Sequence, residues 1–152
     1  MLPHISAKYP LDEPSVFRHT LHMYTAVTHS IQVTALPHFV AERSNAEAGE
    51  YFWAYTIEIV NMGDVAVQLT SRHWRITDEQ GRVEEVRGPG VVGEQPTLKP
   101  GDTFRYTSGC GLRTGSGIMQ GEYRMVDEHG RSFDVQIPAF SLDSPLDRRV
   151  LN

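Results

Sequence analysis

The chain has 152 residues, 39% of them hydrophobic and 22% charged, and its net charge at pH 7 is −5. A chain of this length predicts one domain that buries a core without disulfides or metals. The acidic balance disfavours binding of DNA or RNA through bulk charge and binding to an anionic membrane, because both depend on an excess of Lys and Arg. The one cysteine, Cys110, excludes an intrachain disulfide and favours a reducing, cytoplasmic location.

Residues 1–24 differ from the rest of the chain. They contain three prolines and show little hydrophobic periodicity. They also lack the long apolar run of a secretory signal, and no stretch of the chain reaches the roughly 18 apolar residues of a membrane span. We therefore expect a loosely ordered extension over residues 1–24, with Met23 as an alternative start, and a folded domain at residues 25–152.

From His29 onwards, apolar and polar side chains alternate, which is the pattern of half-buried β-strands. Turn-forming residues separate these segments. Strands are expected near 31–39, 51–60, 65–76, 83–86, 104–112 and 123–125, and a last one through Phe133, Val135, Ile137 and Ala139.

One of these strands changes phase within its length. Val67 and Leu69 share one face, whereas Trp74 and Ile76 have the opposite parity. A regular strand cannot bury both sets, because successive side chains point to opposite faces of a sheet. We therefore predict a β-bulge or a break between residues 70 and 72.

Seven to eight short strands with almost no helical periodicity predict an all-β fold, an antiparallel β-sandwich or barrel. The cysteine pair of immunoglobulin domains is absent, but an immunoglobulin-like or fibronectin type III-like sandwich without a disulfide fits the pattern. The segments 78–86 and 127–135 resemble each other, which we interpret as two hairpin turns of similar chemistry.

The stretch Gly88-Pro89-Gly90-Val91-Val92-Gly93 has the spelling of a dinucleotide-binding motif. That motif requires a helix after the glycines, because the helix amino terminus holds the pyrophosphate. Here Pro96 and Pro100 follow instead, so the sequence predicts a loop and no such helix.

Two interpretations of this loop remain. Its glycines either adopt positive φ and allow close backbone approach, or they form a concave anion site that an arginine completes. Acidic residues between positions 78 and 85 nearly offset the positive charge of the region. The candidate anion site comprises Arg72, Arg87, Gly88, Gly90 and Gly93.

The residues His73, Pro89 and Gln95 are candidates for a surface that contacts a protein partner, because they stand at the phase change or in the loop. No metal-binding spacing such as C-x-x-C or H-E-x-x-H occurs, so no metal site and no cofactor are predicted, and only weak contact of Mg²⁺ or Co²⁺ with carboxylates stays open. Cys110 has the parity of a core residue, and no nucleophile with a supporting base stands out, so no catalytic residue is expected.

Five segments together resemble the ApaG family: YFWAYTIEIVNMG, VQLTSRHWRITDEQG, EVRGPGVVGEQPTLKPG, FRYTSGCGL and IPAFSLDSP. The resemblance runs from about Tyr24 to Asn152 and implies an immunoglobulin-like or fibronectin type III-like sandwich. It also implies a bacterial cytosolic protein genetically linked to cobalt resistance and magnesium efflux. Similar domains in a eukaryotic F-box protein and in a protein that interacts with DNA polymerase delta imply a protein–protein interaction module. The chain departs from the family pattern in its first 22 residues and at Gly115, where a proline is expected.

Three functions follow as hypotheses. The first is a non-enzymatic binding or protein-interaction domain that offers a sheet edge and residues 88–97 to a partner, which includes a homodimer through a sheet edge. The second is a binding site for a small anion, pyrophosphate or a nucleotide, at Gly88–Gly93, an idea that the resemblance also carries. The third, with the least support, is a phosphohydrolase.

Overall fold

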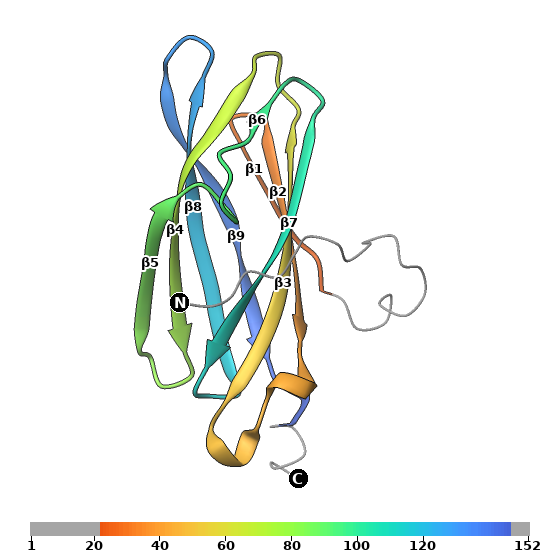
Figure 1. The fold of residues 1–152 in the computed structure, drawn as a ribbon, viewed down its shortest axis with the longest axis vertical. Helices are drawn as coiled ribbons and strands as arrows, with labels where there is room; N and C mark the ends of the chain where they lie inside the picture. Colours follow the sequence, from red (N-terminus) through yellow and green to blue (C-terminus); the bar gives the residue numbers. More distant parts are fainter. Residues whose placement is uncertain (1–21, 147–152) are drawn as a thin grey trace, which may run out of the picture.

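The computed structural model describes residues 22–146, which form two antiparallel β-sheets that face each other (Figure 1). One sheet has the strand order β1-β2-β3-β7, and the other has the order β5-β4-β8-β9, with the short β6 paired to β4. Two short 3-10 helices, η1 (Ala41–Arg43) and η2 (Ala46–Ala48), connect β2 to β3. The strands are β1 (Tyr24–Thr28), β2 (Ile31–Phe39), β3 (Tyr51–Asn61), β4 (Val67–Asp78), β5 (Val83–Pro89), β6 (Thr97–Leu98), β7 (Thr103–Leu112), β8 (Ser116–Asp127) and β9 (Ser132–Asp143).

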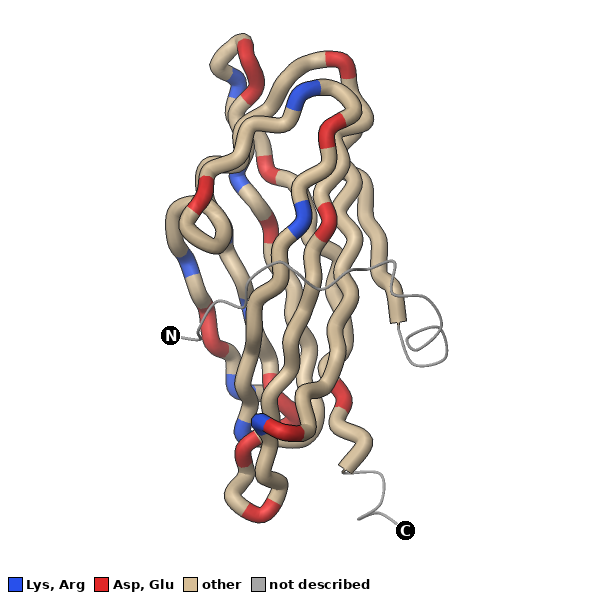
Figure 2. The backbone as a smooth tube through the Cα atoms, turned by 45° about the vertical axis from the view of Figure 1, so that its right-hand side comes forward, with Lys and Arg blue, Asp and Glu red and all other residues tan. Residues whose placement is uncertain are grey.

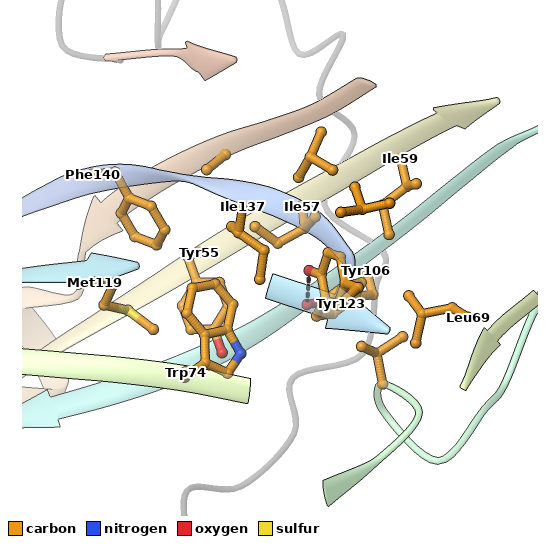
Figure 3. Close-up of a cluster of buried hydrophobic side chains, with 14 of the residues drawn as sticks. Tyr55, Ile57, Ile59, Leu69, Trp74, Tyr106, Met119, Tyr123, Ile137 and Phe140 are labelled. Carbon is orange, nitrogen blue, oxygen red and sulfur yellow. Dashed lines mark hydrogen bonds between the residues drawn. The ribbon is translucent and has the colours of Figure 1, made fainter. Parts of the chain in front are cut away.

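Alternating side chains of the two sheets fill the space between them (Figure 3). The ring of Trp74 lies edge-on to Tyr55 and to Phe140, with centroids 5.3 and 6.0 Å apart, which is the favoured arrangement of aromatic pairs. Deeper in the core, the hydroxyl groups of Tyr106 and Tyr123 hydrogen-bond each other at 2.5 Å. Each of these buried phenols therefore has the polar partner that burial requires.

The phase change predicted between residues 70 and 72 is a β-bulge. In the ladder between β4 and β8, the register shifts between Leu69 and Ser71, with Thr70 as the extra residue. Because of this shift, Leu69 and Trp74 both point into the core. The prediction from parity is confirmed.

A second bulge, in β9, was not predicted. One residue of β8 faces two residues of β9, Pro138 and Ala139. The shift turns Phe140 into the core and leaves Ala139 exposed. The expected alternation through Ala139 is therefore wrong beyond Ile137. Proline cannot donate to a ladder and is tolerated at bulges, which explains the place of the irregularity.

The two similar turn sequences have the same structure. Asp78 accepts hydrogen bonds through its carboxylate from the backbone and the side chain of Arg82. Asp127 accepts the corresponding bonds from the backbone and the side chain of Arg131. The interpretation as two hairpin turns of similar chemistry is confirmed.

The predicted all-β antiparallel sandwich is confirmed, and residues 22–146 form nine strands instead of seven to eight. The two additional strands are weak in sequence: β6 has two residues, and in β1 the apolar Val27 is 55% exposed. Of the extension predicted for residues 1–24, residues 1–21 lie outside the described part, and Tyr24 begins β1. No helix among residues 22–146 is long and apolar enough to cross a membrane.

Candidate functional site

The glycine-rich stretch is partly strand and partly loop. Gly88 and Pro89 complete β5, so the predicted loop begins only at Gly90. The N–H of Gly90 donates to the carbonyl of Thr70, the extra residue of the β4 bulge, at 2.9 Å. A Cβ at Gly90 would lie 2.1 Å from the carbonyl oxygen of Glu94, and the φ angle there is 58°. Glycine is therefore required at this position for both reasons that the sequence suggested, positive φ and close backbone approach.

A two-residue turn forms the tip of the loop. Val91 and Glu94 exchange backbone hydrogen bonds of 2.8 and 2.9 Å. Between them, Val92 and Gly93 have φ angles of 42° and 80°, the combination of a type I′ turn. A β-branched residue with positive φ is strained, at a cost of about 1–3 kcal/mol. Packing of the half-buried Val92 against the core opposes this strain.

Gln95 fixes the far side of the loop. Its side-chain amide donates to the carbonyl of Thr70 at 2.8 Å, and its own backbone carbonyl accepts from the side chain of Gln68 at 3.1 Å. Thr70 thus holds the loop twice, through Gly90 and through Gln95. The β4 bulge is the anchor of the loop.

Arg72 is part of the same loop architecture. It shares the parity of Trp74 on β4 and therefore points to the inner side of the sheet. Its Nη1 donates to the carbonyl oxygens of Pro89 at 3.0 Å and Gly90 at 2.9 Å. The guanidinium lies over Gly88, where a Cβ would come within 3.1 Å of it. Arg72 therefore fastens the end of β5 to β4.

His73 lies on the opposite, outer face of that sheet. Its Nδ1 is 2.5 Å from a carboxylate oxygen of Glu122 on β8, and its Nε2 is 2.7 Å from a carboxylate oxygen of Glu85 on β5. Arg87, the cross-strand neighbour of His73, pairs with Glu85 at 3.3 Å. The hydrogen bond from His73, against a smaller opposing effect of desolvation, holds the pKa of the Glu85 carboxyl below its ordinary value.

The residues that the sequence assigned to an anion site do not face one space. Arg72 points inward and is bonded to loop carbonyls, whereas Arg87 lies on the outer face beside His73. The candidates for a partner surface are divided as well, because Pro89 and Gln95 are exposed on the loop and His73 belongs to the outer network. Within residues 22–146, no group of three His, Cys, Asp or Glu side chains could hold a metal ion.

A cavity of about 220 Å³ lies between the sheets beside Arg72, lined by Tyr55, Trp74 and Cys110 among others. Cys110 is 1% exposed and belongs to the core, as its parity predicted. Burial, with a smaller contribution from Glu84, raises the pKa of the Cys110 thiol to about 12. The thiol is therefore uncharged at neutral pH and does not have the properties of a nucleophile.

A larger cleft of about 810 Å³, which we call the end cleft, lies where η1 and η2 meet the ends of β3, β4 and β7. Arg43, Arg82 and Arg113 line it from three different parts of the chain. Charged segments of both signs gather at this end of the sandwich, the lower end of Figure 2. Arg43 and Arg113 were not predicted as site residues, because each is an isolated charge in a connecting segment with no motif around it.

The sequence of this chain matches a known protein family. The sequence model of the ApaG domain family matches residues 41–127. Protein ApaG of Methylocella silvestris is 68% identical over 130 residues, which are 86% of this chain and 100% of that relative. Protein ApaG of Beijerinckia indica is 63% identical over 130 residues, with the same shares of both chains.

Solved structures agree with the sequence relatives. An ApaA protein from Bordetella pertussis has a TM-score of 0.75 and 48% identity, covering 79% of this chain and 98% of that chain. The C-terminal domain of Wzt, with a TM-score of 0.50 and 10% identity over 90% of this chain and 89% of that chain, shares the fold alone. The family match over more than half of the chain and the high identity of full-length relatives lead to one conclusion: the chain belongs to the ApaG domain family.

Proposed function

We propose that this ApaG-type domain is a non-enzymatic protein-interaction module that presents the glycine loop, residues 88–97, to a protein partner. The observation that carries the proposal is that the loop is exposed and yet fixed. Pro89, Glu94 and Gln95 are exposed, while Arg72 and Thr70 hold the backbone around them. A surface that is already ordered loses less conformational entropy when a partner binds.

The strained residue at the loop tip supports the same proposal. Val92 occupies a turn position that Asn or Gly would occupy at lower cost. Backbone strain of this kind is concentrated at functional segments, where the surrounding structure maintains it. The link to cobalt resistance and magnesium efflux that the family resemblance implies then runs through the partner that binds this loop.

The neighbouring strand β5 extends the proposed surface. It is the edge of its sheet, and most of its residues are exposed. The backbone groups on the outer side of an edge strand accept an additional strand from a partner or from a second copy of the chain. Glu85 and Arg87 supply charges of both signs there, which favours a partner of matching charge pattern.

Site-specific cross-linking tests the proposal. A photoreactive amino acid replaces Glu94 in the loop in one variant and the exposed Glu47 of η2 in a matched control, and both full chains are irradiated in cells. We expect a defined cross-linked partner from position 94 only. With that partner purified, Val92→Asn, which retains the turn, is expected to weaken the complex. Identical products from both positions, or none, would contradict the proposal.

The alternative functions have their own requirements. A small-anion site at Gly88–Gly93 requires Arg72 to leave the carbonyls of Pro89 and Gly90 and to turn towards the ligand. Titration with pyrophosphate and ATP, with and without Mg²⁺ or Co²⁺, tests this alternative through the NMR shifts of the loop amides. A phosphohydrolase requires turnover that Arg87→Ala or His73→Ala abolishes.

A further inference from the structure

We propose that the end cleft is a second binding site, in which Arg43 and Arg113 bind one oxyanion group, a phosphate or a carboxylate, of a small ligand. The cleft shares no lining residue with the glycine loop and meets the proposed partner surface only at Val83 and Glu84, where β5 begins, so the site is distinct from the loop. Its volume of about 810 Å³ lies within the range of small-molecule sites, which is roughly 300–1,000 Å³.

The first observation is how the described arginines are used. Of the nine arginines in residues 22–146, six form ion pairs with carboxylates, and Arg72 donates to carbonyl oxygens. Within that part of the chain, the side chains of Arg43 and Arg113 have neither an ion pair nor a hydrogen bond, and both residues line the end cleft. Each guanidinium carries five N–H donors in a planar fork that matches carboxylate and phosphate oxygens. The two arginines whose guanidinium N–H groups are all unused therefore line the same cleft.

The second observation is that Arg43 is held in place without using those donors. Its guanidinium carbon lies 4.0 Å from the centre of the Phe52 ring. Phe52 in turn lies on Gly109, where a Cβ would be 2.4 Å from its Cζ atom. A guanidinium on an aromatic face is oriented by the ring while its N–H groups stay available. The stack of Gly109, Phe52 and Arg43 thus orders a cation for an external partner.

The third observation is how the sheet brings Arg113 to the same end. Phe52 pairs with Gly111 in the β3–β7 ladder, and Arg113 follows β7 directly. The turn after η2 packs against the backbone of Arg113, because a Cβ at Gly49 would lie 3.6 Å from the Arg113 carbonyl oxygen. Arg43 and Arg113 are therefore carried by neighbouring chain segments at the end of one strand pair, although they are far apart in sequence.

The acidic residues of the cleft restrict the class of ligand. Arg82 is committed to Asp78, with Nε 2.8 Å from the carboxylate. Glu50 and Glu84 also line the cleft, so its lining charges balance and it has no strong overall positive field. Recognition must then come from local hydrogen bonds of the arginines. The cleft fits a ligand with one oxyanion group and a hydrogen-bond-donating remainder better than it fits a polyanion.

NMR titration of the full chain tests this proposal. Inorganic phosphate and acetate are added separately, with chloride keeping the ionic strength constant. We expect one or both to shift the amides of Gly49, Gly111 and Arg113, and the responding anion identifies the ligand group. Arg43→Gln and Arg113→Gln should each weaken binding about tenfold, the loss expected for a charged hydrogen bond.

Matched variants make the test specific. Arg124→Gln, at an exposed arginine outside the cleft, should leave the affinity unchanged, and Glu84→Gln should strengthen binding by removing a like-charged neighbour of the anion. All of these exposed substitutions should preserve the spectrum of the folded chain. Absence of shifts at millimolar phosphate and acetate, or equal affinities in the Arg43→Gln and wild-type chains, would overturn the proposal. Neither result would affect cross-linking from Glu94.

Discussion

The glycine loop and the end cleft both contain arginines, but they use them in opposite ways. At the loop, Arg72 donates to the chain's own carbonyls and closes the end of β5. At the end cleft, Arg43 and Arg113 keep their donors for a partner from outside. The glycine motif thus marks a place where the fold needs close backbone contact. The donors available to a ligand lie where no motif marks them.

The largest effect is expected at the close contact of the loop. Gly90→Ala should lower the free energy of unfolding by about 3 kcal/mol or more, because it adds a steric clash to an unfavourable φ angle. Gly93→Ala is the matched control, since a Cβ there meets nothing within 4 Å, and it should cost only about 1–2 kcal/mol for its positive φ. Urea unfolding of the two variants measures the difference. Equal losses would mean that the approach of Glu94 to Gly90 is not a constraint.

The two kinds of arginine should differ in their effect on stability. Arg72→Met leaves the carbonyls of Pro89 and Gly90 without a donor and should cost about 1–2 kcal/mol, after allowance for partial exposure. Arg43→Met should cost less than about 0.5 kcal/mol, because its donors are not used by the fold. Chemical denaturation of both variants compares them. If Arg43→Met lowered the free energy of unfolding as much as Arg72→Met, the fold would depend on both arginines and the contrast between them would be wrong.

Acidic pH should loosen a turn at the end cleft. Desolvation opposes ionisation of Asp78, but the hydrogen bonds from the Arg82 backbone and side chain outweigh it and hold the pKa of the Asp78 carboxyl below its ordinary value of 3.8. Stability from such a carboxyl is complete above the unfolded pKa and is lost as the pH falls through the lower folded pKa. The melting temperature should therefore fall as the pH drops below 3.8, and Asp78→Asn should flatten that dependence.

The second turn provides the control for this pH effect. Hydrogen bonds, led by that from the Arg131 backbone, lower the pKa of Asp127 in the same way, but this residue does not line the end cleft. Asp127→Asn should flatten the acid dependence of melting without changing phosphate or acetate binding, whereas Asp78→Asn should change both. Thermal melts at pH 3 and 6 and the NMR titration measure the two effects. Equal effects of the two substitutions on ligand binding would show that the Asp78 turn does not contribute to binding in the end cleft.

A small change in stability is also expected at the loop tip. Val92→Asn replaces a strained β-branched residue by one that the type I′ turn prefers, and it loses the packing of a half-buried side chain. These effects oppose each other, so the free energy of unfolding should change by less than about 1 kcal/mol. Thermal unfolding measures it. A loss of several kcal/mol would show that Val92 serves the core and not an exposed surface.

The fold was predictable from sequence where burial demands a pattern. The β4 bulge could be predicted because Leu69 and Trp74 are too large and apolar to be left on the solvent side. The β9 bulge could not, since Ala139 is small enough to suit either face. Strand β1 was not predicted, because its inward residues Ala26 and Thr28 are small or polar and its apolar Val27 points outward.

The candidate sites were predictable to different degrees. The requirement for glycine at Gly90 was one of the two interpretations that the motif left open. The inward direction of Arg72 was not predicted, although it follows from the predicted bulge, which gives Arg72 the parity of Trp74. The bonds from Arg72 to the loop carbonyls depend on how β5 ends, which no local pattern specifies. Arg43 and Arg113 come together only through the β3–β7 ladder, so their proximity is a property of the folded chain.

The most direct test of the contrast between the two regions is the ¹⁵N NMR spectrum of the arginine guanidinium groups, recorded without and with phosphate. Hydrogen bonds to Pro89 and Gly90 should slow rotation of the Arg72 guanidinium and give separate Nη signals that phosphate leaves unchanged. Arg43 and Arg113 should show averaged signals that respond to phosphate. An averaged, phosphate-sensitive signal for Arg72 together with unchanged signals for Arg43 and Arg113 would contradict the account.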